Sequence, residues 1–384
     1  MARKSNPAII GLGLYKASGG PVKTMSKFRE AMGASINCFV NPQQYEREPF
    51  GIDDARIVPA LDFPIARNLC YVRPSQLRDL EEELESVPLL SVHAFYRYHC
   101  LWARDFSVRK KIPYWHVPHG ILDPYVMSYG AISKRLFLGV GGTKFIKDAA
   151  CTIFATRREW EKAESVFGIL QGEVLPWPVD SLDMSNRDRI RSEVRFRLGI
   201  PDSDRVLIYF GRVQTMKRPL ETIEAVAQVK SDTLHLIMVG PSEGISEIEC
   251  LKSAQRAGLK NFHFIGPVFG EEKFNYLFAS DAYISMSIRE NFNHTAAEAL
   301  SVGTPVLLST GNDLSGELAE VGCCWKIEND AIHSAVKQIQ DFCDLDSSVL
   351  QEMGLRGHQW VEEYLNYDLF KSRLGSLLKK YAKK

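Results

Sequence analysis

The chain has 384 residues, enough for two domains at about 100–200 residues each. Lysine plus arginine and aspartate plus glutamate both number 47, so the chain carries no net charge that would attract nucleic acid. The eight cysteines never form a CxxC pair, which favours free thiols in a reducing cytosol. No apolar run approaches the roughly 20 residues of a transmembrane helix, and the MARKSNPAIIG start lacks a signal-peptide core, so we expect a cytoplasmic protein.

Short apolar runs alternate with amphipathic, helix-length segments along the first half of the chain. Helical spacing is found over 75–86, 96–111 and 157–168. The runs that we predict to be strands are 8–14, 35–40, 56–61, 89–95, 113–120, 151–156 and 173–179.

The second half shows the same alternation with more continuous apolar runs. Strands that are apolar throughout are usually buried on both faces of a parallel sheet, with helices covering them. The runs are 206–211, 235–240, 261–266, 282–287 and 306–310. This pattern predicts an α/β protein whose ligands bind at the carboxyl ends of the strands.

The apolar pattern thins over 177–189, where we place the boundary between domains. The first domain is predicted over 1–178 and the second over 188–355. The remaining residues, 356–384, are helical and carry more apolar side chains than a free tail should expose. We therefore predict that this tail packs on one of the domains.

The loop after the strand at 206–211 has the features of an anion site. A helix is predicted to begin near Pro219, but Lys217 and Arg218 precede it where a capping residue would stand. An uncapped helix start favours negative charge through its free N–H groups and its dipole. Arg212 and Lys217 flank this turn and are candidate phosphate contacts, although two solvated cations would also explain them.

The stretch RENFNHTAAEALSVGTPVL at 289–307 places carboxylates around another helix start. Thr295 is predicted to cap that helix, and Glu298, three residues later, could complete a capping box. Glu290 follows a buried strand and has no such structural explanation. We interpret Glu290 and Glu298 as hydroxyl acceptors that flank an anion-binding helix start at Asn293, His294 and Thr295, an arrangement typical of a nucleotide-sugar site.

These two loops resemble those of retaining GT-B glycosyltransferases of family GT4, the glycosyltransferase group 1 type. Its pattern of a Glu, seven residues, then Glu-Ala-Leu and Gly-Thr-Pro-Val is present from Glu290 to Val306. Its GR(4)K loop is present from Gly211 to Lys217. The resemblance is firm over 206–310. A looser likeness covers the His-Gly pair at His119 and a glycine loop at 19–20.

The resemblance implies a role for each matching residue. Arg212 and Lys217 would bind the donor diphosphate, Glu298 the ribose, and Glu290 and His119 the donor sugar. Gly19 and Gly20 would let backbone N–H groups approach a phosphate or the acceptor, and the base would lie near Val268. The implied fold is two Rossmann-like domains facing a cleft, with a C-terminal helix crossing back to the first domain.

The implied reaction moves a sugar from a UDP- or GDP-linked donor to a glycan or lipid-linked acceptor, with retention of configuration and in surface polysaccharide biosynthesis. Departing phosphate would be stabilised by Arg212, Lys217 and the helix start, so we expect neither a metal nor a cofactor. The family loop often carries glycines where Asn291 and Asn293 stand here, but asparagine tolerates a left-handed backbone. The first half of the chain, which should select the acceptor, departs most from the family pattern.

Other interpretations fit the motifs of this sequence less well. An Asp-x-Asp metal site would read Asp202-Ser-Asp204 or Asp344-Leu-Asp346, but neither pair follows a strand. The GLGLYKASGG segment lacks the spacing of a dinucleotide loop, and no zinc motif is present. The alternative function is a catalytically silent sugar-binding or scaffolding subunit.

Cations mixed with apolar residues over 133–148, together with the terminal KKYAKK, favour contact with the inner membrane face, although a buried helix pair would also explain 133–148. Oligomeric state stays open.

Overall fold

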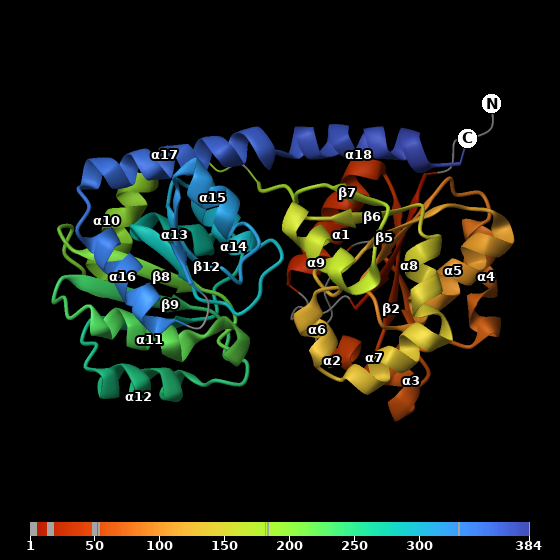
Figure 1. Ribbon diagram of the computed structural model, residues 1–384, viewed down its shortest axis with the longest axis horizontal. Coiled ribbons are helices and arrows are strands. Elements are labelled where there is room, and N and C mark those ends of the chain that lie inside the picture. The colour runs from red at the N-terminus through yellow and green to blue at the C-terminus, as the bar shows by residue number, and fades with distance from the viewer. Residues whose placement is uncertain are drawn as a thin grey trace. The chain divides into compact units, whose positions relative to one another are not determined.

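The computed structural model describes residues 6–13, 19–47, 52, 54–180, 182, 184–328 and 331–383. Two compact units divide the chain, one formed by 1–178 with 368–384 and the other by 179–367. Each unit is a parallel sheet with helices on both faces (Figure 1).

The first unit contains a sheet with the strand order β3-β2-β1-β4-β5-β6-β7. Its strands are β1 (Ala8–Leu12), β2 (Ser35–Val40), β3 (Arg56–Pro59), β4 (Leu90–His93), β5 (Tyr114–Val117), β6 (Cys151–Phe154) and β7 (Gly172–Val174). Its helices are α1 (Gly20–Met32), α2 (Pro42–Arg47), α3 (Pro64–Leu69), η2 (Pro74–Leu77), α4 (Arg78–Leu84), α5 (Tyr98–Lys110), α6 (Pro124–Ser128), α7 (Ala131–Phe137), η3 (Leu138–Gly142), α8 (Thr143–Asp148) and α9 (Arg157–Phe167).

The second unit contains a sheet with the strand order β10-β9-β8-β11-β12-β13. Its strands are β8 (Arg205–Phe210), β9 (Leu234–Val239), β10 (Phe262–Gly266), β11 (Ala282–Ser285), β12 (Val306–Ser309) and β13 (Cys324–Ile327). Its helices are α10 (Arg187–Leu198), η4 (Thr215–Lys217), α11 (Pro219–Gln228), α12 (Glu247–Ala257), α13 (Glu272–Ala279), α14 (His294–Ser301), α15 (Ser315–Val321), α16 (Ile332–Cys343) and α17 (Ser347–Tyr364).

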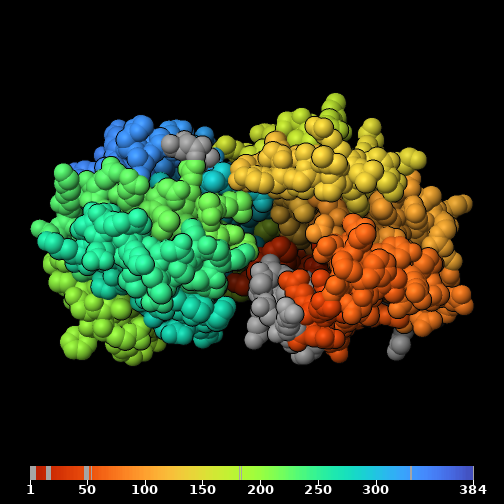
Figure 2. Space-filling view, turned by 90° about the horizontal axis from the view of Figure 1, so that it is seen from below, coloured from red at the N-terminus to blue at the C-terminus, as the bar shows by residue number. Residues whose placement is uncertain are grey.

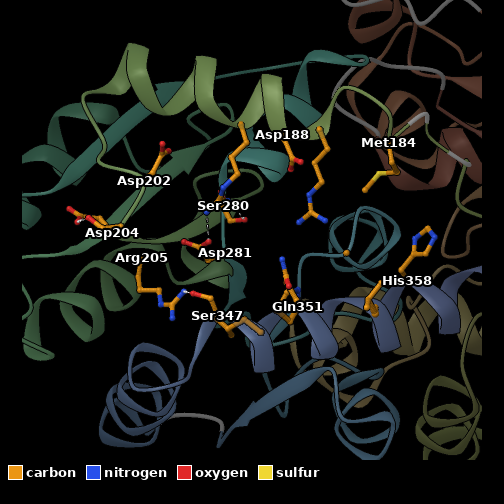
Figure 3. Close-up of a pocket in the computed structure, with 17 residues that line it drawn as sticks. Met184, Asp188, Asp202, Asp204, Arg205, Ser280, Asp281, Ser347, Gln351 and His358 are labelled. Carbon is orange, nitrogen blue, oxygen red and sulfur yellow. Dashed lines mark hydrogen bonds and ion pairs between the residues drawn. The ribbon is translucent and has the colours of Figure 1, made fainter.

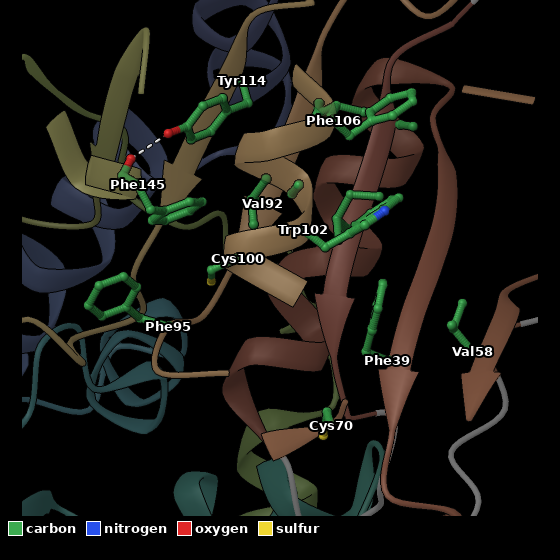
Figure 4. Close-up of a cluster of buried hydrophobic side chains, with 14 of the residues drawn as sticks. Phe39, Val58, Cys70, Val92, Phe95, Cys100, Trp102, Phe106, Tyr114 and Phe145 are labelled. Carbon is green, nitrogen blue, oxygen red and sulfur yellow. Dashed lines mark hydrogen bonds between the residues drawn. The ribbon is translucent and has the colours of Figure 1, made fainter. Parts of the chain in front are cut away.

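Apolar side chains from strands and helices fill the space between the layers. In the first unit, Phe39 and Val92 on the strands pack with Trp102 and Phe106 of α5, whose rings stack with centroids 5.7 Å apart (Figure 4). These side chains are 5% exposed or less. Continuous burial on both faces of a parallel sheet explains why the predicted strands were apolar throughout. Each predicted strand is present, and β13 was missed.

The C-terminal helix α18 (Tyr367–Tyr381) is grouped with the first unit from Asp368 onward. Phe370 packs edge-on against Phe28 of α1, with ring centroids 5.4 Å apart. Lys380 and the Tyr381 hydroxyl contact the Glu173 carboxylate at 2.6 and 3.0 Å. The tail was predicted to begin at 356, but α17 continues to Tyr364 as part of the second unit, so the change of unit lies about a dozen residues later.

Candidate active site

The order of strands in the second sheet positions the site. The chain runs outward from β8 through β9 to the edge strand β10, and then returns to β11 on the other side of β8. At such a reversal the loops that follow the two central strands diverge and leave room for a ligand at their carboxyl ends. Both loops singled out from the sequence, after β8 and after β11, lie at this position.

The loop after β8 ends in an uncapped helix start, as predicted. Arg218 adopts a left-handed conformation with φ of 53°, and α11 begins at Pro219 without a hydrogen bond from a capping side chain. Ile223 and Val226 of α11 are buried and anchor the helix on the sheet. The first turn of α11 therefore presents backbone N–H groups and the positive end of its dipole.

Lys217 and Glu290 form an ion pair between the β8 and β11 loops. Each side chain is 16% exposed, and the two loops are joined nearby by a 2.9 Å hydrogen bond from Ile288 N to Met216 O. Glu290 was predicted to be unpaired, and the structure corrects this. Tertiary packing brings the carboxylate to the lysine although 72 residues separate them in the chain.

Arg212 does not share this pairing. Its Nη1 atom lies 3.1 Å from both carboxylate oxygens of Glu243, in the loop after β9. Both side chains are nearly half exposed, so the pair contributes little to stability and can separate at small cost. Arg212 is therefore available to an anionic ligand, whereas Lys217 must share its charge with Glu290.

The start of α14 is capped differently from the prediction. Asn293, with φ of 53°, is the N-cap residue, and its side chain accepts a hydrogen bond from Ala296 N at 3.2 Å. Its Nδ2 atom donates to Asn312 Oδ1 at 2.7 Å. The predicted cap at Thr295 is wrong, because Thr295 already lies in the first turn. The buried Asn293 side chain holds the loop, and His294 and Thr295 follow it in the first turn of α14.

Glu298, on the same helix, pairs with a residue that the sequence did not single out. Lys273 Nζ, at the start of α13, lies 2.5 Å from Glu298 Oε1, and the two side chains are 14% and 15% exposed. The carboxylate is thus held in place by a neighbouring cation. The sequence signal for Lys273 was its position in the first turn of the helix that follows the loop in which Val268 lies.

Two glycines let the loops around this site pass close to one another. A Cβ on Gly240, at the end of β9, would lie 1.8 Å from the carbonyl oxygen of Gly211. A Cβ on Gly311, after β12, would lie 2.2 Å from the carbonyl oxygen of Ile288. No other residue fits at either position, so both glycines fix the backbone next to Lys217 and Glu290. Val268, the predicted base contact, follows the edge strand β10 and is half-buried.

In the first unit, His119 follows β5 with a left-handed backbone, φ 53°. Its Nε2 atom lies 3.0 Å from His93 Nδ1, and His93 Nε2 lies 3.0 Å from Ser91 Oγ. His93 is buried, and its pKa is lowered by that burial and by the neighbouring His119. A neutral His93 can therefore fix the orientation of the His119 ring.

Glu159 holds the loop that carries His119. Its two carboxylate oxygens accept hydrogen bonds from Gly120 N at 2.5 Å and Ala155 N at 2.8 Å, and the residue is 4% exposed. Thr156 caps the same helix, so a threonine followed three residues later by a glutamate was the available sequence signal. That spacing is typical of a capping box, but the Glu159 carboxylate joins the loops after β5 and β6.

Gly19 and Gly20 lie where α1 begins, after β1. Gly19 has φ of 56° and ψ of −122°, a conformation that favours glycine, and α1 has no capping side chain. The first turn of this 13-residue helix offers backbone N–H groups, as the glycine loop led us to expect. Residues 14–18, which precede this glycine pair, lie outside the described part of the chain.

The buried histidines of the first unit predict a loss of stability in acid. Burial lowers the pKa of His99 to about 4 and that of His116 to about 3, from an ordinary value of 6.5. The unfolded chain takes up protons below pH 6.5 before the folded protein does, so stability is fully present above pH 6.5 and declines toward pH 4. We expect the urea midpoint, followed by tryptophan fluorescence, to fall between pH 7 and 4.5. His99→Gln should show a shallower decline, and an unchanged slope would contradict this assignment.

Comparison with known proteins finds a family match within the second unit. The glycosyl transferases group 1 family matches residues 190–358, and this segment resembles that family over less than half of the chain. A D-inositol 3-phosphate glycosyltransferase of Nocardioides sp. is 33% identical over 145 residues, which cover 34% of this chain and 32% of that protein. The chain thus matches about a third of the length of its curated glycosyltransferase relatives.

Solved structures show that the likeness of fold extends over both units. Anabaena Alr3699/HepE in complex with UDP superimposes with a TM-score of 0.77 at 15% identity, covering 98% of this chain and 100% of that one, and its complex with UDP-glucose gives a TM-score of 0.73 at 16% identity. WaaG, a glycosyltransferase involved in lipopolysaccharide biosynthesis, gives a TM-score of 0.69 at 12% identity over 96% and 98% of the two chains. The chain has the GT-B fold.

No helix among the described residues has both the length and the apolar character needed to cross a bilayer. The same residues contain no group of three or more His, Cys, Asp or Glu side chains placed to hold a metal ion.

Proposed function

We propose that the chain is a retaining glycosyltransferase that moves a sugar from a nucleotide-diphosphate sugar to a glycan or lipid-linked acceptor. The observation that carries this proposal is the meeting of Lys217, Glu290 and the uncapped start of α11 at the strand reversal of the second sheet. A cation and a helix start bind phosphate, and a carboxylate beside them binds sugar hydroxyls. The names of the group 1 relatives and the UDP-glucose complex of HepE support the same class of reaction.

The donor contacts follow from the positions of these groups. Lys217, Arg212 and the first turn of α11 bind the diphosphate, with the backbone at His294 and Thr295 adding N–H groups. Glu298, held by Lys273, accepts hydrogen bonds from the ribose hydroxyls, and the base lies near Val268. Glu290 accepts hydrogen bonds from the donor sugar once the phosphate shares the charge of Lys217. His119 belongs to the His-Gly motif of the first unit, and its ring is oriented by His93. We propose that it contacts the transferred sugar.

The chemical step breaks the bond between the anomeric carbon and the phosphate oxygen, which leaves new negative charge on the nucleoside diphosphate. Lys217 and Arg212 stabilise that charge as it develops, with the α11 dipole aligned to it. The acceptor hydroxyl attacks from the same face, and its proton passes to the departing phosphate oxygen. This route retains configuration and uses no metal ion and no protein nucleophile.

A second surface supports a lipid-linked acceptor at the inner membrane face. Ile132, Leu136 and Val140 project at intervals of four residues along α7 and η3 and are 85%, 69% and 70% exposed. Exposed cations lie in the same segment, namely Arg135, Lys144 and Lys147. We call these six residues the α7 patch; the segment is drawn in yellow in Figure 2. Aliphatic side chains beside cations favour an anionic bilayer surface. In the other predicted segment, Lys380 is instead paired with Glu173.

The decisive experiment is calorimetric titration with a panel of UDP- and GDP-linked sugars, followed by an assay of donor hydrolysis. We expect one nucleotide to bind and Glu298→Ala to weaken the nucleotide by about tenfold or more, because a charge-assisted hydrogen bond contributes about 1.5–3 kcal/mol. Glu320→Ala, on an exposed surface of the same unit, is the control.

Three results would decide between the candidate functions. Binding followed by turnover supports the transferase. Binding without hydrolysis or transfer would instead identify a silent sugar-binding subunit. Failure of every nucleotide sugar to bind would refute both.

A further inference from the structure

A cavity of about 640 Å³ lies at the amino ends of the strands of the second sheet, whereas the candidate donor site lies at their carboxyl ends (Figure 3). It is bordered by the residues at which three strands begin: Arg205 of β8, Asp281 before β11 and Pro305 before β12. Lys217 and Glu290 follow the other ends of β8 and β11. The cavity is therefore separated from them by the length of the sheet, and the proposed donor chemistry does not use it.

The helix α10 lines the cavity with arginines spaced four residues apart, which places them on one face. Arg191 and Arg195 each lie 2.7 Å from a different oxygen of Asp281, so that carboxylate is fully engaged. Arg187, one turn earlier, has no carboxylate, carbonyl or hydroxyl partner for its side chain within the described part of the chain. Its Nη1 atom lies 3.1 Å from the position that a Cβ on Gly303 would take.

The carboxylates near Arg187 do not offset its burial. Burial lowers the pKa of Arg187 and the charge of Arg191 lowers it further, while Asp188 and Asp281 raise it by less. Among the acidic residues lining the cavity, Asp204 is bound to His235 at 3.1 Å, and Asp188 and Asp202 are exposed. A half-buried guanidinium without a partner is costly, and an external anion would offset that cost.

Polar groups from α17 complete the lining. The amide of Gln351 and the ring of His358 both project from this helix toward the open space (Figure 3). His358 Nδ1 lies 2.7 Å from the carbonyl oxygen of Ser301, so Nδ1 carries the proton and donates. Its Nε2 atom is then left to accept a hydrogen bond when the ring is neutral and to donate one when it is protonated. Arg205, at the other end, donates to Leu345 O at 2.6 Å.

We propose that this cavity binds a small phosphate-bearing anion, with Arg187 as the main contact and with Gln351 and His358 as hydrogen-bonding partners. The volume exceeds that of inorganic phosphate and suits a phosphorylated small molecule such as a sugar phosphate. The site is independent of the proposed transferase activity, since it shares no residue with the donor site.

The test is calorimetric titration of the full chain with inorganic phosphate. We expect the wild type to bind phosphate and Arg187→Gln to bind it at least tenfold more weakly. Arg189→Gln is the matched control, since Arg189 lies on the same helix, is exposed and pairs with Glu193. Gln351→Glu supplies a carboxylate inside the cavity and should also abolish binding. Gln351→Glu serves as the test variant if Arg187→Gln does not fold.

Several outcomes would overturn the proposal. Unchanged affinity in both Arg187→Gln and Gln351→Glu would do so, as would the absence of binding in the wild type. If Lys217→Ala lost phosphate binding and Arg187→Gln kept it, the phosphate would bind at the candidate donor site and not in this cavity. Titration with a hexose phosphate separates the sources of the anion. Tighter binding than phosphate identifies a sugar phosphate as the ligand, and equal binding identifies free phosphate.

Discussion

Lys217→Ala should lower kcat for donor hydrolysis or transfer by about 10²–10³-fold, the usual cost of removing one group that stabilises developing charge. Glu290→Ala should reduce turnover severely as well, because it removes the proposed hydroxyl acceptor. Each change also leaves one largely buried charge without its partner, at a cost of about 1–3 kcal/mol in the free energy of unfolding. A domain with about 5–15 kcal/mol of stability remains folded after that loss.

The Lys217–Glu290 pair makes a sharper test possible. Because the two side chains neutralise one another, the stability of Lys217→Ala/Glu290→Ala should exceed the value obtained by adding the two single losses. Activity, by contrast, should not recover in the double variant. Lys252→Ala, on the exposed face of α12, is the control for both measurements. Wild-type rates in both single variants would remove these two residues from the active site.

Ile132→Glu/Leu136→Glu should abolish most binding to vesicles that contain anionic lipid. Burial of one such side chain contributes about 1.5–3 kcal/mol, so losing two should lower the partition coefficient roughly 100-fold or more. Binding should also weaken as salt concentration rises, because Arg135, Lys144 and Lys147 act through screened attraction. Vesicle flotation at two salt concentrations measures both effects.

The second unit provides a matched control for the α7 patch. Ile248 and Leu251 of α12 are 62% and 45% exposed, in the teal surface of Figure 2. Ile248→Glu/Leu251→Glu therefore introduces the same charges at a comparable apolar pair. We expect vesicle binding and nucleotide binding to be unchanged in it. If both double variants weaken vesicle binding equally, or if the wild type does not bind at all, the α7 patch has no membrane role.

Fold class and most strands could be predicted from the sequence because a parallel sheet buried on both faces requires short, continuous apolar runs between helices. The exception, β13, is short and lies at the edge of its sheet, with Lys326 exposed between buried Trp325 and Ile327. A single four-residue run of this kind gives too weak a periodic signal. The boundary of the C-terminal tail was also misplaced, since α17 and α18 are both helical with buried apolar side chains and only Leu365 and Asn366 separate them.

Local patterns on the chain were enough to predict the uncapped start of α11 at Pro219, the left-handed backbone at Asn293 and the two loops at the strand reversal. Each depends on neighbours in sequence and on backbone sterics. Pairing did not follow from the sequence: Lys217 with Glu290, Lys273 with Glu298, Arg212 with Glu243, and Glu159 with the backbone of Gly120. Electrostatic partners are chosen by distance in space, and only the folded sheet brings these charges from separate loops within a few ångströms of one another. Arg187 could not be singled out from the sequence for the same reason. That a side chain lacks a partner is known only when the positions of all its neighbours are known.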